Sequence, residues 1–183
     1  MNESTIPGVR FVRHRRQEDL RGAFLEIWRA SAFDATSGVP TLFVQSNRST
    51  SARDVLRGLH LHRRQLDYWT VLSGKAFVAL VDCRPLLDGS GDRAIVETRT
   101  LRADDAVVIP VGVAHGFLAI EALDLLYQVT NEYDSSDELG FAWDDPAIGV
   151  PWPHLDTPDG LPILSDRDRM NPSLAELVAS LRS

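Results

Sequence analysis

The sequence predicts a mainly-β protein, a sandwich or barrel of short strands with one short helix near the C-terminus. Three observations support this fold class. Short runs of β-forming residues follow one another through the middle, turn residues separate them, and an amphipathic segment lies near the end. The chain has 183 residues, of which 44% are hydrophobic and 25% are charged. These values suit a single domain spanning residues 1–183.

The expected strands are apolar or alternating runs that contain many β-branched and aromatic residues. In chain order they are Val55–His62, Tyr68–Leu72, Ala76–Val81, Ala94–Arg99, Ala106–Ile109, Ala114–Ile120 and Leu125–Thr130. The turn signals between them are Ser73-Gly74, Asp88-Gly89-Ser90-Gly91, Asp104-Asp105 and Pro110-Val111-Gly112. Many short strands at this spacing are typical of a sandwich or barrel.

The last forty residues differ from this pattern. The segment from Trp143 to Pro162 is rich in proline and aspartate, so we expect an irregular loop that covers the barrel. After it, Asn171 has the character of a helix N-cap, and Pro172 suits the first helical position. The sequence Ser173–Val178 then predicts a short amphipathic helix packed on the barrel.

The composition argues against several classes of function. A formal net charge of −7 does not suit a general nucleic-acid binder, which needs a basic surface. Apolar stretches stay short of the ~20 residues that span a bilayer. The N-terminus has no signal-peptide pattern, so we expect a cytoplasmic protein without a membrane partner. The single cysteine, Cys83, continues an apolar run, which indicates a buried structural thiol rather than a nucleophile.

Two compact histidine motifs stand out. The first is Arg57-Gly58-Leu59-His60-Leu61-His62. Alternate residues of a strand face the same side, so His60 and His62 should point the same way. Arg57 would face the opposite side of a regular strand, but a bulge at Gly58 would bring it round.

The second motif runs from Ile109 to Phe117 and contains a Pro-x-Gly turn. This turn places His115 near the start of the next strand, beside Gly116, which leaves room for a ligand. A lone histidine is usually structural. Two histidines on one strand face and a third after such a turn favour a functional site.

The two motifs resemble those of the cupins, whose fold is a double-stranded β-helix, or jelly roll. In metal-binding cupins the corresponding residues are ligands, so the resemblance implies His60, His62, Asp67 and His115 as a possible set for a divalent transition metal. Asp67 stands where the cupin pattern has glutamate. Gly74 and the sequence Pro110-x-Gly112-x-x-His115 complete the likeness.

A longer resemblance, from about Arg21 to Asp168, is to the dTDP-4-dehydrorhamnose 3,5-epimerase family. These are cupin-fold enzymes that work without a metal on a dTDP-linked 4-keto-6-deoxyhexose. The segments that carry the resemblance are Arg21–Glu26, Phe43–Asn47, Val55–His60, Val81–Arg84, Ile109–Phe117, Leu126–Asn131, Trp143–Gly149, Trp152-Pro153 and Leu164–Asp168.

This resemblance implies a mechanism in deoxysugar biosynthesis. His60 matches the base that removes a proton beside the C4 ketone, and Asp168 matches the carboxylate paired with that base. Tyr127 matches the acid that returns a proton to the opposite face, with inversion at C3, C5 or both. From the residues alone, Tyr127 fits a core position equally well, and Asp168 reads as a solvated loop acid.

The resemblance also implies the binding residues and the assembly. Arg57 and His115 match positions around the sugar and the pyrophosphate. Some of the nucleotide-binding positions come from a neighbouring subunit in the family, so we expect a homodimer that binds a dTDP-sugar. The matching nucleotide-binding residues are Arg21, Phe24, Glu26, Gln45 and Asn47. For Phe24, a core position is the simpler interpretation of the sequence alone.

The chain departs from the family at three positions. His62 replaces a glutamine, Asp67 replaces a lysine suited to stabilising an enolate oxygen, and Glu132 replaces a common tyrosine. The first two changes restore the metal-ligand pattern of the cupins. The leading hypothesis is an epimerase with no cofactor, because His60, Tyr127 and Asp168 are all present. The alternatives are a metal-binding cupin and a sugar-nucleotide-binding cupin without catalysis.

Overall fold

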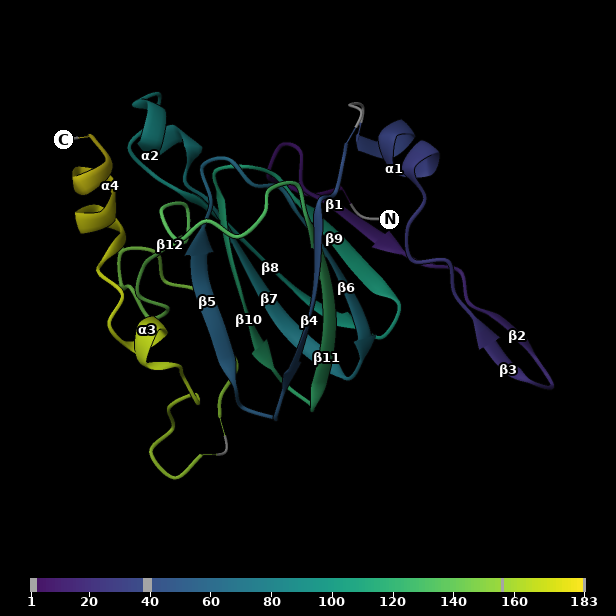
Figure 1. Ribbon diagram of the computed structural model, residues 1–183. Helices are drawn as coiled ribbons and strands as arrows, with labels where there is room; N and C mark the ends of the chain where they lie inside the picture. Colours follow the sequence, from purple (N-terminus) through teal and green to yellow (C-terminus); the bar gives the residue numbers. More distant parts are fainter. Residues whose placement is uncertain (1–2, 38–40, 156, 183) are drawn as a thin grey trace.

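The computed structural model describes residues 3–37, 41–155 and 157–182, and it contains two five-stranded antiparallel sheets (Figure 1). The first sheet has the order β1 (Arg10–Arg13), β9 (Asp105–Ile109), β6 (Asp67–Ser73), β11 (Leu123–Val129) and β4 (Gln45–Ser51). The second has the order β12 (Leu139–Gly140), β5 (Leu56–Leu61), β10 (Val113–Ala119), β7 (Lys75–Asp82) and β8 (Ile95–Arg102).

The pairing of these strands confirms the predicted jelly roll. Strand β4 pairs with β11, β5 with β10, β6 with β9 and β7 with β8, so the chain folds back on itself as a coiled antiparallel ribbon. The inner faces of both sheets pack together. Val78 and Phe117 from the second sheet share one hydrophobic core with Trp69, Val107 and Leu125 from the first.

All seven predicted strands are present, with ends displaced by no more than a few residues. The sequence interpretation missed β1, β4 and β12, and also the short helices α1 (Ala30–Ser37), α2 (Arg84–Asp88) and α3 (Asp166–Arg169). Strand β4 has the sequence QSNRSTS, which lacks the apolar alternation of a half-buried strand. Its pairing with β11 rather than its side chains makes it a strand.

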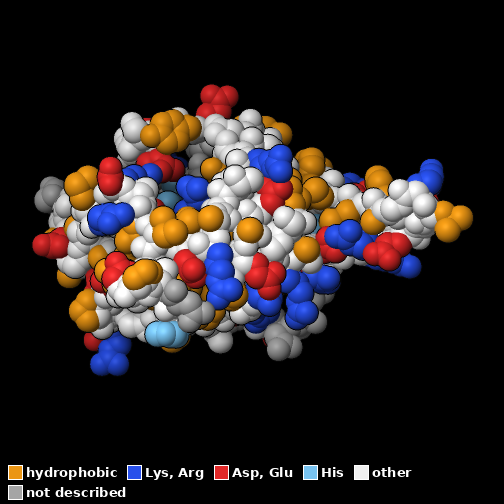
Figure 2. All heavy atoms as spheres, turned by 90° about the horizontal axis from the view of Figure 1, so that it is seen from below, with side chains coloured by type: hydrophobic (Ala, Val, Ile, Leu, Met, Phe, Trp, Pro, Cys, Tyr) orange, Lys and Arg blue, Asp and Glu red, His pale blue; other side chains and the backbone are white. Residues whose placement is uncertain are grey.

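An unpredicted hairpin, β2 (Gln17–Asp19) with β3 (Gly22–Phe24), forms an arm that stands away from the sheets in Figure 1. Figure 2 shows the same arm protruding from the body, with charged and hydrophobic side chains along it. Leu20 at the turn is fully exposed, and Phe24 is 66% exposed. An arm with these apolar side chains in water is suited to contact another molecule.

The C-terminal helix α4 (Leu174–Arg182) is present, but its predicted start was wrong. Ser173 caps it, not Asn171. The Ser173 Oγ accepts a hydrogen bond from the Glu176 N–H (3.3 Å), and the Glu176 carboxylate accepts one from the Ser173 N–H (2.8 Å). This reciprocal capping box outweighs the asparagine and proline signal upstream. Leu174 and Leu177 then pack into the core beneath the helix.

The predicted covering loop is confirmed for its described residues, because the structure has no helix or strand between residues 143 and 162, residue 156 being outside the description. Trp143, Trp152 and Leu155 from this loop pack on Leu56 and Leu118 of the second sheet. The loop therefore covers the outer face of that sheet.

Two smaller expectations concern burial and the membrane. Cys83 is fully buried, and burial raises the pKa of its thiol to about 12, so it is a structural residue as predicted.

Among the residues that the structure describes, no helix has both the length and the apolar character needed to cross a membrane.

Candidate active site

A cavity of about 230 Å³ opens between the two sheets, and both histidine motifs contribute to it. Its walls come from β5 and β10 of the second sheet and from β6, β11 and β4 of the first, with loop residues at one end. The lining residues are Ser49, Arg57, His60, His62, Gln65, Asp67, Trp69, His115, Phe117, Leu125, Tyr127, Glu138 and Arg167.

His60 on β5 is held by a carboxylate from the far end of the chain. Its Nε2 lies 2.7 Å from Oδ1 of Asp168, which is on the short helix α3. Ser165 caps that helix by accepting from the Asp168 N–H at 3.1 Å, and this fixes the orientation of the aspartate. The contact engages Nε2, so Nδ1 is the ring nitrogen left for proton transfer in the cavity.

Asp168 is buried, whereas the residues of the sequence alone suggested a solvated loop acid. Burial raises the pKa of this carboxyl group, but hydrogen bonds from His60, Ser165 and the Gly58 backbone outweigh burial and leave the pKa below its ordinary value. Asp168 is therefore ionised at neutral pH. An ionised partner stabilises the imidazolium that forms when His60 accepts a proton.

The predicted bulge in β5 is present. His60 pairs with His115 and Arg57 pairs with Phe117, so two residues of β5 lie opposite Gly116 alone. Gly58 has φ +129, and a Cβ atom there would lie 2.6 Å from the Gly116 Cα. The extra residue brings Arg57 to the same cavity as His60, where its Nε donates to the Ser51 Oγ at 3.0 Å.

Tyr127 lines the cavity from the opposite sheet. It lies on β11 between Trp69 of β6 and Asn47 of β4, and its ring also packs against the main core. Burial and the negative charges of Asp67 and Glu138 raise the pKa of its phenol. The phenol therefore keeps its proton at neutral pH, as a proton donor must.

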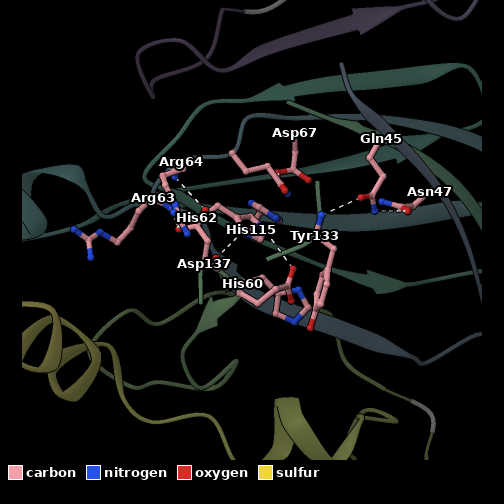
Figure 3. Close-up of polar contacts among 12 residues, drawn as sticks. Gln45, Asn47, His60, His62, Arg63, Arg64, Asp67, His115, Tyr133 and Asp137 are labelled. Atoms are coloured by element: carbon pink, nitrogen blue, oxygen red, sulfur yellow. Dashed lines mark hydrogen bonds and ion pairs between the residues drawn. The ribbon is translucent and has the colours of Figure 1, made fainter. Parts of the chain in front are cut away.

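His62, Asp67 and His115 form a buried cluster, and their candidate ligand atoms all lie within 4.8 Å of one another (Figure 3). Burial raises the pKa of Asp67 and holds the pKa of His115 well below its ordinary value. The four-ligand metal set proposed from the sequence needs correction, because His60 does not join this cluster. Its Nε2 is turned to Asp168 instead.

Gln45 and Asn47 lie side by side on β4, as two alternate residues of a strand should. The Gln45 Nε2 donates to the Asn47 Oδ1 at 2.9 Å, and the Gln45 Oε1 accepts from the Tyr133 N–H at 2.9 Å (Figure 3). Asn47 is also the β-partner of Tyr127, so this polar pair sits next to the cavity wall.

The structure of a single chain does not bring Arg21, Phe24 and Glu26 to the cavity. Arg21 and Phe24 belong to the protruding β2–β3 arm, and Glu26 follows it. Arg21 donates to Asp19, and Glu26 accepts from Arg29. None of these three residues lines the cavity of its own chain.

Sequence reasoning missed two charged residues at the end of the cavity. Glu138 lies 3.9 Å from the His62 Nε2 and forms an ion pair with Arg167. Glu138 lies in an acidic segment with Asp134 and Asp137, and Arg167 lies in the alternating run Asp166–Arg169. Charged runs of either kind usually indicate a solvated surface. Their position in the cavity depends on how the loops pack, which cannot be predicted from the local sequence.

The family model described as dTDP-4-dehydrorhamnose 3,5-epimerase matches residues 3–176 of the chain. The chain belongs to the dTDP-4-dehydrorhamnose 3,5-epimerase family. A curated family member from Pseudomonas aeruginosa is 35% identical over 181 residues, which cover 93% of this chain and 93% of that protein. The family resemblance predicted from the sequence is therefore confirmed, and the chain is an isomerase-class enzyme.

Solved structures of the epimerase family agree with this assignment. The Mycobacterium tuberculosis rmlC epimerase has a TM-score of 0.88 and 33% identity, covering 97% of this chain and 90% of its own. The Legionella pneumophila dTDP-6-deoxy-D-glucose-3,5-epimerase, solved with dTDP-4-keto-L-rhamnose, has a TM-score of 0.86 and 29% identity, covering 97% and 94% respectively. The two-sheet fold described above is thus the fold of the epimerase family.

Proposed function

We propose that this epimerase family member inverts C3, C5 or both in a dTDP-linked 4-keto-6-deoxyhexose, by proton removal and return through an enolate. One observation carries the mechanism. The His60–Asp168 pair (2.7 Å) and the Tyr127 phenol face a common cavity from opposite sheets. A base on one side of a carbon and an acid on the other are what inversion requires.

The proposed reaction begins when His60 Nδ1 accepts the proton bonded to the carbon beside the C4 ketone. The C–H electron pair moves into the ring to form a carbon–carbon double bond, and the carbonyl electrons move to oxygen to give the enolate. Tyr127 then donates its phenolic proton to the opposite face of the same carbon. Solvent returns one proton to the tyrosinate and removes one from the imidazolium, which restores both groups.

The substrate class is supported by the polar groups around the cavity and by the relatives. Arg57 carries a positive charge at the cavity wall, suited to a pyrophosphate. The Legionella pneumophila relative was solved with a dTDP-sugar. The polar pair of Gln45 and Asn47 lies beside the wall and offers amide groups for a nucleotide base.

We also propose a cytoplasmic homodimer. The exposed arm carries Arg21 and Phe24 away from its own cavity, and in a two-fold pair each arm would reach the partner's site. Such an exchange would bury Phe24 and Leu20 and complete the nucleotide site.

The test of this function is solvent deuterium incorporation at C3 and C5 of a dTDP-4-keto-6-deoxyglucose in D₂O, with wild type compared with His60→Ala. We expect His60→Ala to slow incorporation on the order of 100-fold or more, because it removes the general base. The matched control is His154→Ala, which changes an exposed histidine outside the cavity. Near-normal incorporation by a folded His60→Ala protein would contradict the proposal.

A further inference from the structure

Two histidines of the cavity are oriented as metal ligands are. His62 Nδ1 lies 2.8 Å from the Asp137 carbonyl oxygen, and His115 Nδ1 lies 3.1 Å from the Val113 carbonyl oxygen. A carbonyl only accepts, so each Nδ1 donates a proton to its carbonyl, and Nε2 is the ring nitrogen left to bind a metal. Metal-bound histidines are typically fixed in this way, by a hydrogen bond from the nitrogen that does not bind the metal.

The backbone partner of His62 is itself held in place. The Asp137 carboxylate accepts from the Arg63 N–H at 2.9 Å and from the Arg64 N–H at 3.1 Å (Figure 3). This ties the loop after β5 to the segment that supplies the carbonyl. The orientation of the His62 ring therefore belongs to the folded framework and does not depend on a ligand.

Asp67 supplies a carboxylate to the same cluster. It is 3% exposed, and Gln65 Nε2 donates to its Oδ2 at 3.1 Å. The Trp69 side chain is a second hydrogen-bond partner of this carboxylate. The Gln65 amide and the Trp69 indole are both uncharged donors, so a bound cation would supply the countercharge of this buried carboxylate.

We propose that His62, Asp67 and His115 bind a divalent transition-metal ion in the cavity. Two imidazoles and one carboxylate are a ligand set that suits such ions and leaves coordination positions open. Ligand atoms bonded to one ion at ~2.1 Å lie roughly 3 to 4 Å apart. The three atoms here lie within 4.8 Å of one another, so side-chain movements of about an ångström complete the site.

The site shares its cavity with His60 and Tyr127. A bound ion would supply positive charge near an enolate oxygen, a role that rests on the proposed function. His60 stays outside the ligand set because its Nε2 is bonded to Asp168, so metal binding and proton transfer use different histidines.

The experiment measures binding of Zn²⁺ and Co²⁺, each added alone, to the full chain after dialysis against a chelator. Calorimetry gives the stoichiometry, and the visible absorption of Co²⁺ reports the ligand environment. We expect one ion per wild-type chain. Since loss of an outer partner already costs about 10- to 100-fold in metal affinity, loss of a ligand in Asp67→Asn or His62→Gln should cost at least that much.

Matched controls are Asp92→Asn and His154→Gln, which make the same chemical changes at exposed positions and should leave binding unchanged. Circular dichroism establishes that each variant is folded, and Asp67→Asn keeps the shape of the side chain. Failure of wild type to bind either ion, or equal affinity in folded Asp67→Asn, would overturn the proposal. Deuterium incorporation measured with and without the ion tests the epimerase function separately, because binding does not require turnover.

Discussion

At the scale of single residues, the site depends on partners that fix ring orientation and charge. His60 faces Asp168, whereas His62 and His115 face backbone carbonyls. One histidine is thus prepared to accept a proton into an ion pair. The other two donate from Nδ1 to a backbone carbonyl, which leaves Nε2 as the nitrogen available to the cavity. Three histidines in two sequence motifs therefore have two different chemical characters, set by what each second ring nitrogen contacts.

Asp168→Asn should slow deuterium incorporation by on the order of 100-fold. The amide retains the shape of the side chain but cannot stabilise the His60 imidazolium as a carboxylate does. The rate of incorporation in D₂O checks this, with Asp166→Asn on the same helix as control, since Asp166 is exposed. A folded Asp168→Asn protein with wild-type rate would show that the pair has no part in catalysis.

Asp168 should also contribute to the pH dependence of stability. Its pKa is lowered in the folded state, so its contribution is present above the unfolded pKa of ~3.9 and is lost as pH falls through the lower folded value. Urea unfolding at pH 7 and near pH 3 measures this. The difference in unfolding free energy between wild type and Asp168→Asn should shrink at the lower pH. A difference that stays constant would argue against this linkage.

Tyr127→Phe should separate proton removal from inversion. His60 can still remove a proton and return a deuteron to the same face, so incorporation should persist within about tenfold of wild type. Inversion should fall on the order of 100-fold, because the donor on the opposite face is missing. Nuclear magnetic resonance of the product measures both quantities at once. Equal losses of incorporation and inversion would count against Tyr127 as the acid.

At the scale of elements, the bulge in β5 decides which side chains share the cavity. Without the extra residue, Arg57 and His60 would point to opposite faces of the sheet. Gly58 permits the bulge because it has φ +129 and no side chain, and β10 contributes Gly116 at the point of closest approach. The two glycines therefore serve the geometry of the site as well as the strand pairing.

Gly58→Ala should destabilise the protein by about 2 kcal/mol or more, because its Cβ would lie 2.6 Å from the Gly116 Cα. The control is Gly22→Ala in the arm, where φ is +127 and no atom lies within 4 Å of the added Cβ. It should cost only the backbone strain, roughly 1 kcal/mol. Urea unfolding compares the two, and equal losses would show that the close approach to β10 carries no extra cost.

At the scale of the whole molecule, the two sheets form the cavity and the β2–β3 arm lies outside it. The hairpin that carries Arg21 and Phe24 lies away from the body, as Figures 1 and 2 show. The prediction that residues 1–183 form one domain stays a prediction, and so does the homodimer. A dimer that exchanges arms would give each site residues from two chains.

This arrangement predicts complementation between two inactive variants. His60→Ala lacks the base and Arg21→Ala lacks a binding residue of the arm. In a mixed dimer one of the two sites has both His60 and Arg21, so an equal mixture after subunit exchange should recover about a quarter of wild-type activity. Epimerase assays of the mixture, with light scattering of each variant, test this expectation.

The matched control mixes His60→Ala with Asp168→Asn. Both residues belong to the same site in the same chain, so no mixed dimer restores an intact pair. A monomer with full activity, or equal recovery in both mixtures, would contradict arm exchange.

The sequence by itself determined the seven central strands and the family of this protein, and it allowed for the bulge. Alternation and turn residues are local properties, so the seven central strands could be predicted within a few residues. On a regular strand Arg57 and His60 face opposite sides, so the sequence indicated only that a bulge at Gly58 would bring them together, and the strand register shows that bulge. The cap of the last helix was predicted wrongly, because Ser173 rather than Asn171 caps it.

Only the tertiary structure decided which distant groups meet. Asp168 lies 108 residues from His60, and Asp67 reaches His62 and His115 through strand register across two sheets. Glu138 and Arg167 enter the cavity through loop packing, while Arg21 and Phe24 leave it on the arm. Periodicity tells which face of a strand a side chain occupies. Which faces come together depends on how the strands pair and pack across the whole chain. The free energy of that pairing and packing comes from contacts between distant segments, so no local segment contains it.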